Sequence, residues 1–438
     1  MKAILQELEP IVGESGICDW ENLKPVWQER IARATSPEDF PSSIVYPSIA
    51  EELKSVITRA YSNGWGVLPC GSGTKLGWGG MSKGVDLVVS TERLNRVVEH
   101  AVGDLTVTVE AGVKFADLQE ILLKTGQFLP LEPAYPQEAT IGGIVATADS
   151  GSWRQRYGGV RDMLLGISFV RSDGQIAKAG GRVVKNVAGY DLMKLFTGSY
   201  GTLGILTEVT LRVYPVQEAA ATVVLTGEKE AIASATKTLL ASALTPTAVD
   251  LLSTKLITQL GFAQGMGLMV RFQSVTDSVK EQSSRLLEVG QQLGLQGTLY
   301  TDANEANLWQ SLQEQIWTAP HQPAITCKIG VLPTAAVTTL TQLDTLTSST
   351  GLGFIHAGSG LGRLRLDPAV VTPETILEMR RHCQAQSGFL TLLEAPISLK
   401  QQLDVWGYNS SALNIMSQIK QQFDPKNLLS PYRFVGGI

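Results

Sequence analysis

At 438 residues the chain is longer than one hydrophobic core usually supports, so we expect two or three domains. Hydrophobic residues make up 44% and charged residues 18%, as in ordinary globular enzymes, and the net charge of −5 argues against a nucleic-acid or polybasic membrane-binding role. The four cysteines lie far apart without a CxxC pair, which excludes a recognisable iron–sulfur or structural zinc site and indicates a reducing compartment.

The N-terminal part combines short apolar runs with acidic residues. Glu7 and Glu9 stand where an export signal needs an apolar run, and no apolar stretch of about 18 residues follows, so we expect neither a secretion signal nor a spanning helix. After the turn-rich TSPEDFPSS, residues 44–64 predict a strand, a turn and an amphipathic helix. Ser48 is the predicted N-cap with Glu51 as its capping-box partner, and Gly64 ends the helix.

Alternating and β-branched residues predict strands at 85–90 and 105–112, followed by a helix closed by Gly126. A hairpin is predicted around Asp173–Gly174, and a strand ends at Pro215. Strands and helices mix without regular βαβ alternation, which favours an α+β class over a doubly wound sheet.

From residue 218 the order strand, helix, strand, strand, helix, strand is compatible with a ferredoxin-like domain. We therefore divide the chain into an N-terminal extension at 1–40, a first domain at 41–217, a cap domain at 218–420 and a C-terminal tail at 421–438 that returns to the first domain.

Three glycine-bearing loops follow or precede predicted strands: PCGSGTK at 69–75, TIGG at 140–143 and GSYGTLGI at 198–205. The first is neither a Walker A loop, because Leu76 follows Lys75, nor a Rossmann fingerprint, because Leu76 replaces the third glycine. Each glycine alone is equally explained by a tight turn with positive φ. Together, bare glycines with flanking hydroxyls suit a pocket for a large phosphate-bearing cofactor, and we predict FAD.

The longer segments around these loops resemble a known family. PCGSGTKLGWGG, LEPAYPQEATIGGIVATADSGSWRQRYGGVRDMLLG and GRVVKNVAGYDLMKLFTGSYGTLGILTEVTLRV are similar to the FAD-binding domain of vanillyl-alcohol oxidase, p-cresol methylhydroxylase and the D-lactate and glycolate dehydrogenases. FDPKNLLSPYRF resembles the closing motif of that family, and the FAD-binding subunits of bacterial glycolate oxidases look most similar. The resemblance covers about residues 40–217 and implies a two-subdomain FAD-binding domain of the p-cresol methylhydroxylase type plus a ferredoxin-like α+β cap.

The resemblance also implies which residues contact FAD. In the first loop these are Pro69, Cys70, Gly71, Ser72, Gly73, Thr74 and Lys75 around the pyrophosphate. Near the flavin they are Pro133, Thr140, Gly142, Gly143, Ser150, Gly151, Tyr157 and Gly158, and beside the cofactor Gly201, Gly204 and Ile205. Thr74 stands where tethering members have histidine, so we predict non-covalent FAD. Arg154, Arg156 and Lys185 are either cations that stabilise the reduced flavin or surface charges.

The catalytic motif of the family is altered here. Catalytic D-lactate and glycolate dehydrogenases carry H-P-G-D-G-N-x-H and a later Glu-His pair, which bind a divalent metal and the hydroxy acid. The matching stretch is HAGSGLGR at 356–363, and LLEAP keeps Glu394 with Ala395 in place of histidine. We predict no metal site, since Arg363 would repel the ion. His356 is the candidate base, and Arg363 or Arg365 the candidate carboxylate ligand.

The resemblance implies an oxidoreductase subunit of a glycolate oxidase complex, with a catalytic flavoprotein sister and an iron–sulfur subunit as partners. Two alternatives stay open: a self-sufficient FAD-dependent 2-hydroxy acid dehydrogenase that uses His356, and a structural flavoprotein subunit without turnover. We expect a cytoplasmic protein, held at most peripherally at the inner face of a membrane through its partners.

Overall fold

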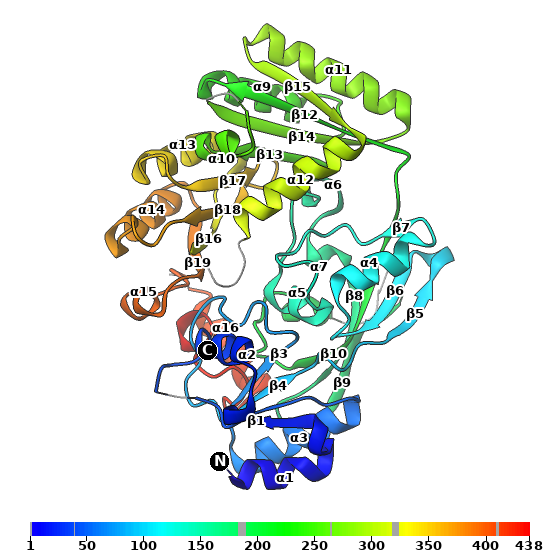
Figure 1. Cartoon of the computed structure of the whole chain (residues 1–438), viewed down its shortest axis with the longest axis vertical. Helices are drawn as coiled ribbons and strands as arrows, with labels where there is room; N and C mark the ends of the chain where they lie inside the picture. Colours follow the sequence, from blue (N-terminus) through cyan, green and yellow to red (C-terminus); the bar gives the residue numbers. More distant parts are fainter. Residues whose placement is uncertain (1, 39, 183–189, 263–264, 318–323, 409–410) are drawn as a thin grey trace. The chain divides into compact units, whose positions relative to one another are not determined.

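The computed structural model describes residues 2–38, 40–182, 190–262, 265–317, 324–408 and 411–438. The chain folds into two compact units, and Figure 1 labels most of their helices and strands. The first unit contains the described parts of residues 1–151, 158–216 and 408–438, and the second contains those of residues 152–157 and 217–407. Both units combine helices with sheets, which confirms the predicted α+β class. The four predicted domain limits stay a prediction.

A four-stranded sheet forms one half of the first unit. Its order is β1 (Ile17–Asp19), β2 (Ser43–Val45), β4 (Leu87–Ser90) and β3 (Val67–Cys70). Only the β1–β2 pair is antiparallel. One face packs on α1 (Lys2–Val12) and α3 (Ala50–Asn63), and the other on α2 (Pro25–Ala32). The strands are buried on both faces, as expected for a largely parallel sheet.

Of the two predicted ends of helix α3, the C-terminal end is confirmed and the N-terminal end is not. Gly64 closes the helix at φ 72°, as predicted. The predicted N-cap is wrong, because the helix begins at Ala50 with Ile49 at the cap position and no side-chain cap bond. The N–H of Ser48 instead donates to Oε2 of Glu52 at 2.7 Å, so the glutamate one position beyond the predicted Glu51 satisfies the helix start.

A five-stranded antiparallel sheet forms the other half of the first unit. Its order is β5 (Val97–Ala101), β6 (Thr106–Glu110), β10 (Ile205–Arg212), β8 (Leu164–Val170) and β9 (Ile176–Gly180). The predicted β8–β9 hairpin is confirmed, with Gly174 at φ 84°. Beside it lie α4 (Phe115–Leu123), α5 (Ile141–Thr147), α7 (Val160–Met163), α8 (Met193–Phe196) and the pair β7 (Gln127–Phe128) and β11 (Tyr214–Pro215). Helix α5 packs against β6 and β10.

The C-terminal segment folds back onto the first sheet. It contains α16 (Leu413–Phe423) and an extended stretch that runs beside β3. The N–H of Val67 donates to the carbonyl of Leu428 at 2.7 Å, and the N–H of Ser430 donates to the carbonyl of Val67 at 2.8 Å. The strand that leads into the first glycine loop is therefore fixed by residues more than 350 positions later in the chain.

One eight-stranded sheet builds the second unit, in the order β15-β12-β14-β13-β17-β18-β16-β19. The strands are β12 (Ala219–Gly227), β13 (Ala248–Leu252), β14 (Met266–Ser274), β15 (Gln296–Thr301), β16 (Ile325–Gly330), β17 (Leu352–His356), β18 (Leu361–Leu366) and β19 (Phe389–Glu394). Strands β12 to β15 have the 4-1-3-2 order of a ferredoxin-like unit, and β16 to β19 repeat it. The predicted ferredoxin-like topology therefore occurs twice, with the halves joined by antiparallel pairing of β13 with β17.

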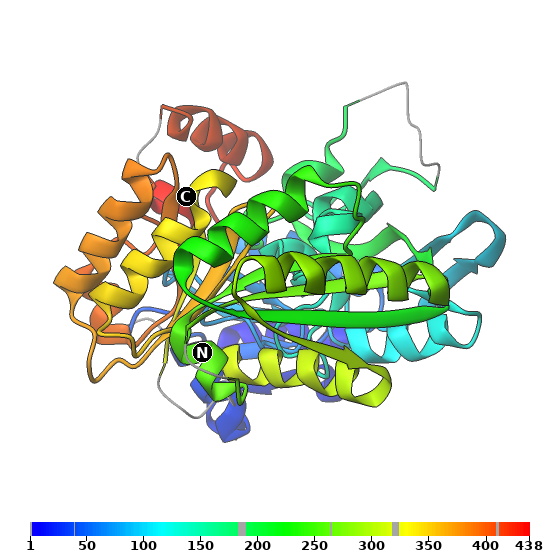
Figure 2. The ribbon, with the colours of Figure 1, turned by 90° about the horizontal axis from the view of Figure 1, so that it is seen from above.

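Helices cover the two faces of this sheet unequally. The apolar core on one face is closed by α9 (Lys229–Ala241), α11 (Thr276–Gln292), α13 (Ala336–Leu346) and α14 (Pro373–Ala385). The opposite face is covered near β12 to β17 by α10 (Thr254–Gln259) and α12 (Asp302–Ile316). Figure 2 shows the green strands of the first half between α11 and α12. On that opposite face, β16 and β18 present polar side chains.

Short elements complete the structure. They are α6 (Arg154–Tyr157), which packs on β13, α15 (Ile397–Gln402), and the 3-10 turns η1 (Glu14–Gly16), η2 (Trp20–Asn22), η3 (Val102–Asp104), η4 (Pro333–Ala335) and η5 (Val435–Gly437). Among the helices in the described ranges, none is long and apolar enough to cross a membrane.

Candidate functional site

The three glycine loops border one pocket in the first unit. The first loop follows β3, the second opens α5, and the third precedes β10. The pocket encloses about 730 Å³, including solvent at its mouth. Of the predicted cofactor residues, Pro69, Cys70, Gly71, Ser72, Gly73, Thr74, Lys75, Thr140, Gly142, Gly143, Gly201, Gly204 and Ile205 line it.

Glycines let these loops approach one another closely. A Cβ on Gly71 would lie 2.0 Å from Oγ1 of Thr140, so the first and second loops touch only because Gly71 has no side chain. Gly201 has φ 76°, and its Cβ would lie 2.6 Å from Cγ of Pro69. The glycines thus let the three loops come together.

Hydrogen bonds fix the first loop from outside. Oγ of Ser72 donates to the carbonyl of Glu138 at 2.7 Å, and Nη1 of Arg30 donates to the carbonyl of Ser72 at 2.7 Å. Oγ of Ser90 donates to the carbonyl of Gly71 at 3.0 Å. Two of these bonds use loop carbonyls and the third uses the Ser72 hydroxyl, so none of them consumes a backbone N–H group of the loop.

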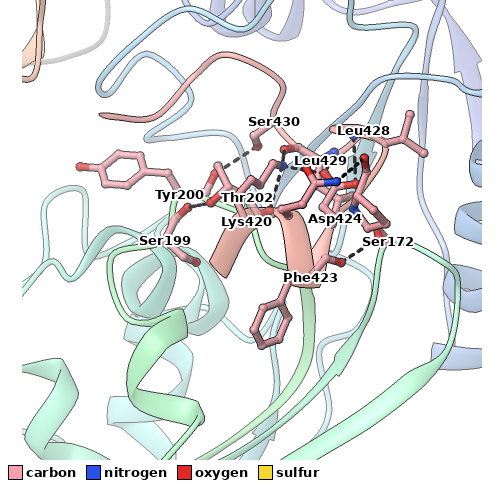
Figure 3. Close-up of polar contacts among 12 residues, drawn as sticks. Ser172, Ser199, Tyr200, Thr202, Lys420, Phe423, Asp424, Leu428, Leu429 and Ser430 are labelled. Carbon is pink, nitrogen blue, oxygen red and sulfur yellow. Dashed lines mark hydrogen bonds and ion pairs between the residues drawn. The ribbon is translucent and has the colours of Figure 1, made fainter. Parts of the chain in front are cut away.

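The C-terminal segment secures the third loop, as Figure 3 shows. Nζ of Lys420 lies 2.6 Å from Oδ2 of Asp424 and donates to the carbonyls of Thr202 at 3.0 Å and Leu429 at 2.9 Å. Oγ of Ser430 donates to the carbonyl of Tyr200 at 3.1 Å. The Lys420 and Asp424 side chains are 7% and 0% exposed, so this ion pair is desolvated.

Two cationic side chains lie in the pocket wall. Nζ of Lys75 pairs with Oδ2 of Asp149 at 2.8 Å, and both side chains are almost fully buried. The same Asp149 oxygen accepts the N–H of Ala134 at 2.7 Å. Arg433 is the second cation, and within the described pocket lining neither aspartate nor glutamate occurs. This charge distribution favours an anionic ligand.

Comparisons with known proteins agree with this geometry. Residues 41–180 match the family model described as FAD binding domain, and residues 405–434 match that of the C-terminal domain of FAD linked oxidases. The solved structure of p-cresol methylhydroxylase with substrate bound aligns with a TM-score of 0.76 at 14% identity, over 99% of this chain and 96% of that one. A mitochondrial D-lactate dehydrogenase (cytochrome) from Arabidopsis thaliana is 26% identical over 456 residues, which cover 95% of this chain and 78% of that protein.

The chain is an FAD-dependent oxidoreductase. Its fold is of the p-cresol methylhydroxylase type, so the predicted fold and the predicted cofactor are both confirmed. Glycolate oxidase subunit GlcE from Escherichia coli (strain K12) is 37% identical to this oxidoreductase over 167 residues, which cover 38% of this chain and 47% of that protein. The alignment therefore spans less than half of that relative.

The pocket fits FAD in its chemistry. A diphosphate needs backbone N–H groups, hydroxyls and cations, and the wall offers three glycine loops, Thr74, Lys75 and Arg433. When bound, FAD would accept the two electrons of an oxidation. Burial raises the pKa of the Cys70 thiol, which keeps it protonated and unreactive. This agrees with the prediction that FAD is held without a covalent bond.

The predicted residues Pro133, Ser150, Gly151, Tyr157 and Gly158 lie outside the pocket lining. Oγ of Ser150 accepts the N–H of Val160 at 3.2 Å and so supports the start of α7. A Cβ on Gly151 would lie 2.5 Å from that of Glu132, and Gly158 has φ 81°. Three of these residues thus have structural explanations, and contact of any of the five with FAD stays a prediction.

Of the other predicted cations, Arg154 and Arg156 do not belong to the pocket lining, and contact of either of them or of Lys185 with the flavin stays a prediction. The short segment 152–157 belongs to the second unit and contains Arg154, Arg156 and Tyr157. In this segment the Tyr157 ring lies 5.8 Å from the Trp153 ring. Arg156 is exposed. Lys185 lies outside the described residues.

Sequence reasoning missed several pocket residues: Leu76, Thr91, Ala111, Ala146, Thr147, Ser199, Tyr200, Leu206 and Arg433. Most follow directly on a predicted strand or sit within a motif that the sequence already singled out. Ala111 comes one residue after β6, and Thr91 one residue after β4. Arg433 lies in the closing motif FDPKNLLSPYRF, from which no site residue was selected.

The candidate base His356 lies at the end of β17 and is 5% exposed. Its Nδ1 is 2.6 Å from Oδ1 of the fully buried Asp250, whose other oxygen accepts the hydroxyl of Ser152 at 2.5 Å. Because an ionised carboxylate only accepts, we assign the proton on the ring to Nδ1, which leaves the lone pair on Nε2. His356 is therefore oriented as a base by its partner.

Cations occupy the neighbouring strands. Arg363 on β18 stands opposite Lys328 on β16 and Phe354 on β17. Directly opposite residues, and residues two apart in one strand, share a face of a sheet, so Arg363, Lys328 and His356 project from the same face. Nη1 of Arg365 donates to the carbonyl of Gln315 at 2.7 Å. Such a row of cations would attract a carboxylate and repel a divalent metal ion.

Proposed function

We propose that this chain is the FAD-binding subunit of a glycolate oxidase complex and passes on the electrons from oxidation of glycolate or D-lactate. The pairing of Arg363 with Lys328 carries the proposal. In the motif where catalytic relatives of the resembled family place metal-binding histidine and carboxylate, this chain has Arg363, Ser359 and Leu361, and a lysine faces the arginine. These side chains provide no ligand set for a divalent ion.

The partners follow from this chemistry. Substrate oxidation would take place on a sister flavoprotein, and electrons would leave through an iron–sulfur subunit. The 37% identity to a protein named glycolate oxidase subunit GlcE supports membership in a multi-subunit assembly. We propose a cytoplasmic location, with any attachment to a membrane made through these partners.

The Asp250–His356 pair favours a second candidate, a self-sufficient dehydrogenase for 2-hydroxy acids. Nε2 of His356 would take the hydroxyl proton of the substrate while the C–H hydride, with its two electrons, passes to FAD, and the product is the 2-oxo acid. Arg363 would hold the substrate carboxylate, and Asp250 would stabilise the imidazolium that forms.

Anaerobic titration of the FAD-loaded chain separates the two candidates. We expect glycolate and D-lactate to leave the flavin absorption unchanged in the isolated chain and to bleach it once the sister subunit is added. Bleaching of the isolated chain by substrate alone would refute the subunit proposal.

A histidine variant tests the second candidate directly. If the chain works alone, His356→Ala should lose bleaching with unchanged FAD content, and His382→Ala, on α14 of the same unit, should not. If the subunit proposal holds, both variants should support electron transfer in the assembled complex at near wild-type rates.

A further inference from the structure

Strand β15 is an open edge of the eight-stranded sheet. It pairs with β12 on one side, and within the described residues no strand pairs with its other side. Five of its six residues are exposed. Every second residue of such an edge directs its N–H and C=O away from the sheet, so β15 offers a row of backbone donors and acceptors to another strand.

The composition of β15 favours pairing over protection from it. Exposed edge strands commonly carry a charged residue or a proline, which hinders pairing with another chain. The two edge strands of the five-stranded sheet follow this rule, with Glu99 in β5 and Lys178 in β9. The sequence of β15, QGTLYT, contains neither a charge nor a proline, and its Leu299 is 46% exposed.

Helix α11 packs over β12 and β15, and Figure 1 shows it beside this edge. A Cβ on Gly297 would lie 2.7 Å from Cδ2 of Leu287, so Gly297 of β15 faces α11. Because side chains alternate along a strand, Leu299 faces α11 as well. Tyr300 belongs to the opposite face, where its ring lies 5.9 Å from that of Phe262. Another chain at this edge would therefore meet Leu299 and the outer side of α11 together.

A stripe of three exposed residues, each four positions from the next, runs along α11: Lys280, Ser284 and Glu288. At about 100° per residue, they lie roughly 20°, 60° and 100° around the helix from Leu287, which contacts β15. Gln282, on the other side of the helix, accepts the N–H of Thr245 at 2.7 Å from the loop after α9. The stripe therefore faces away from α9 and over the open edge.

This stripe is complementary to a second copy of itself that runs in the opposite direction. Ser284 is midway between Lys280 and Glu288, so a two-fold axis at the serine sets each lysine against the glutamate of the other copy. The ion pair within α11 uses Glu281 and Arg285 instead. A stripe with this symmetry of charge fits another copy of this chain.

The strand supplies the same axis independently. A two-fold axis at Leu299 pairs β15 with its copy in antiparallel register and sets Gly297 opposite Thr301. Helix α11 and β15 run in opposite directions, and Gly297 lies beside Leu287. From there, two strand residues to Leu299 rise about 6.6 Å and three helix residues to Ser284 rise about 4.5 Å. The two centres therefore agree to about 2 Å.

The spacing of the layers allows both contacts at once. Neighbouring strands lie about 4.8 Å apart, so two copies of α11, each over its own β12 and β15, would lie roughly 10–14 Å apart. A lysine and a glutamate side chain together span that distance.

We propose that β15 and α11 form the interface of a homodimer, in which two copies of β15 pair antiparallel about Leu299 and two copies of α11 exchange ion pairs between Lys280 and Glu288. The proposal goes beyond the function proposed above, and it depends neither on the substrate nor on other subunits.

Charge exchange tests the helix contact. Lys280→Glu sets two glutamates against each other at both ends of the interface and should weaken the dimer. The double variant Lys280→Glu, Glu288→Lys reverses both partners and restores opposite pairing. Lys237→Glu is the matched control, because Lys237 is also an exposed lysine and lies on α9, which α11 separates from the edge.

Sedimentation velocity of the FAD-loaded chain measures the dimer dissociation constant against a monomer mass of 47.1 kDa. By symmetry the single reversal converts two attractions into repulsions, so the Kd should rise roughly tenfold or more in Lys280→Glu. The double variant should stay within about threefold of wild type, and Lys237→Glu should not differ from it.

Leu299→Lys tests the strand contact. It sets like charges opposite each other at the two-fold axis, and we expect this variant to be monomeric. Its FAD content should equal that of wild type, since the pocket lies in the first unit. Circular dichroism and flavin content check the folding of each variant.

A wild-type chain that sediments as a monomer would overturn the proposal, and so would a dimer whose Kd neither Lys280→Glu nor Leu299→Lys changes. A double variant as weak as Lys280→Glu would contradict the exchange of ion pairs. If the isolated chain were monomeric and Leu299→Lys abolished binding of a different subunit, the edge would belong to that subunit and the homodimer would be refuted. If Leu299→Lys did not fold, the charge-exchange series would decide.

Discussion

The buried pair of Lys420 and Asp424 offers the sharpest test of how the cofactor site is held together. Replacing Asp424 by asparagine keeps the size of the side chain and leaves the Lys420 ammonium in a desolvated site. Breaking a buried pair in this way costs about 3–5 kcal/mol. For a unit of this size the melting temperature should fall by roughly 6–20 °C.

In the assay the FAD-loaded protein is heated, and the rise of flavin fluorescence reports the release of FAD from the first unit. Glu29→Gln is the control, because Glu29 and Arg33 also form an i,i+4 pair in the first unit, with side chains 40% and 41% exposed. Exposed pairs contribute at most about 1 kcal/mol, so we expect a shift within about 4 °C. The double variant Lys420→Met, Asp424→Asn should be more stable than Asp424→Asn, since no buried charge stays unbalanced. If Asp424→Asn melted as close to wild type as Glu29→Gln, the reasoning from desolvation would be refuted.

Further predictions concern the pocket. Gly73→Val should purify with at least about tenfold less FAD, measured as the flavin-to-protein ratio, because Gly73 has φ 77° and its Cβ would lie 2.7 Å from Trp27. Gly84→Val, at φ 65° with open space around its Cβ, is the control and should keep FAD. Removal of FAD should lower the melting temperature of the first unit by roughly 5–11 °C relative to protein at 100-fold Kd of FAD, and an unchanged value would contradict FAD binding in this unit. Native Cys70 should react with iodoacetamide at pH 8.5 at least about tenfold more slowly than in urea, by peptide mass spectrometry, because burial raises its pKa.

The reason for the Gly73 prediction comes from the structure. The structure directs the Cβ toward Trp27 on α2, so the substitution would displace the loop by way of that helix.

The sequence predicted the local parts of the site well because their signals are local. Gly73 follows a short strand, Gly201 precedes one, and both have positive φ. Such positions can be predicted from the residue type and its spacing from the strand. For the same reason, the sequence correctly placed the glycines that follow two helices, Gly64 and Gly126, and the glycine in a hairpin turn, Gly174. Each of them has φ above 60°.

Contacts between distant segments could not be predicted. The contact of Arg433 with the carbonyl of Leu76 depends on the tail lying beside β3, and nothing in SPYRF reveals that register. The pairing of His356 with Asp250 depends on the junction of β13 with β17, between halves that share a topology without a visible sequence repeat. The start of α3 was misplaced by one residue because two neighbouring glutamates, Glu51 and Glu52, are equivalent candidate acceptors for the N–H of Ser48, and Glu52 is the one that accepts it.

The tail that lies beside β3 has a consequence for biosynthesis. The bond from Arg433 to Leu76 joins residues 357 positions apart, so the ribosome must translate most of the protein after the first loop emerges. At about 5–20 residues per second this takes roughly 20–70 s. During that interval the edge of β3 lacks its final neighbour, and flavin insertion should be a late event of maturation, completed after translation has reached the last of these contacts.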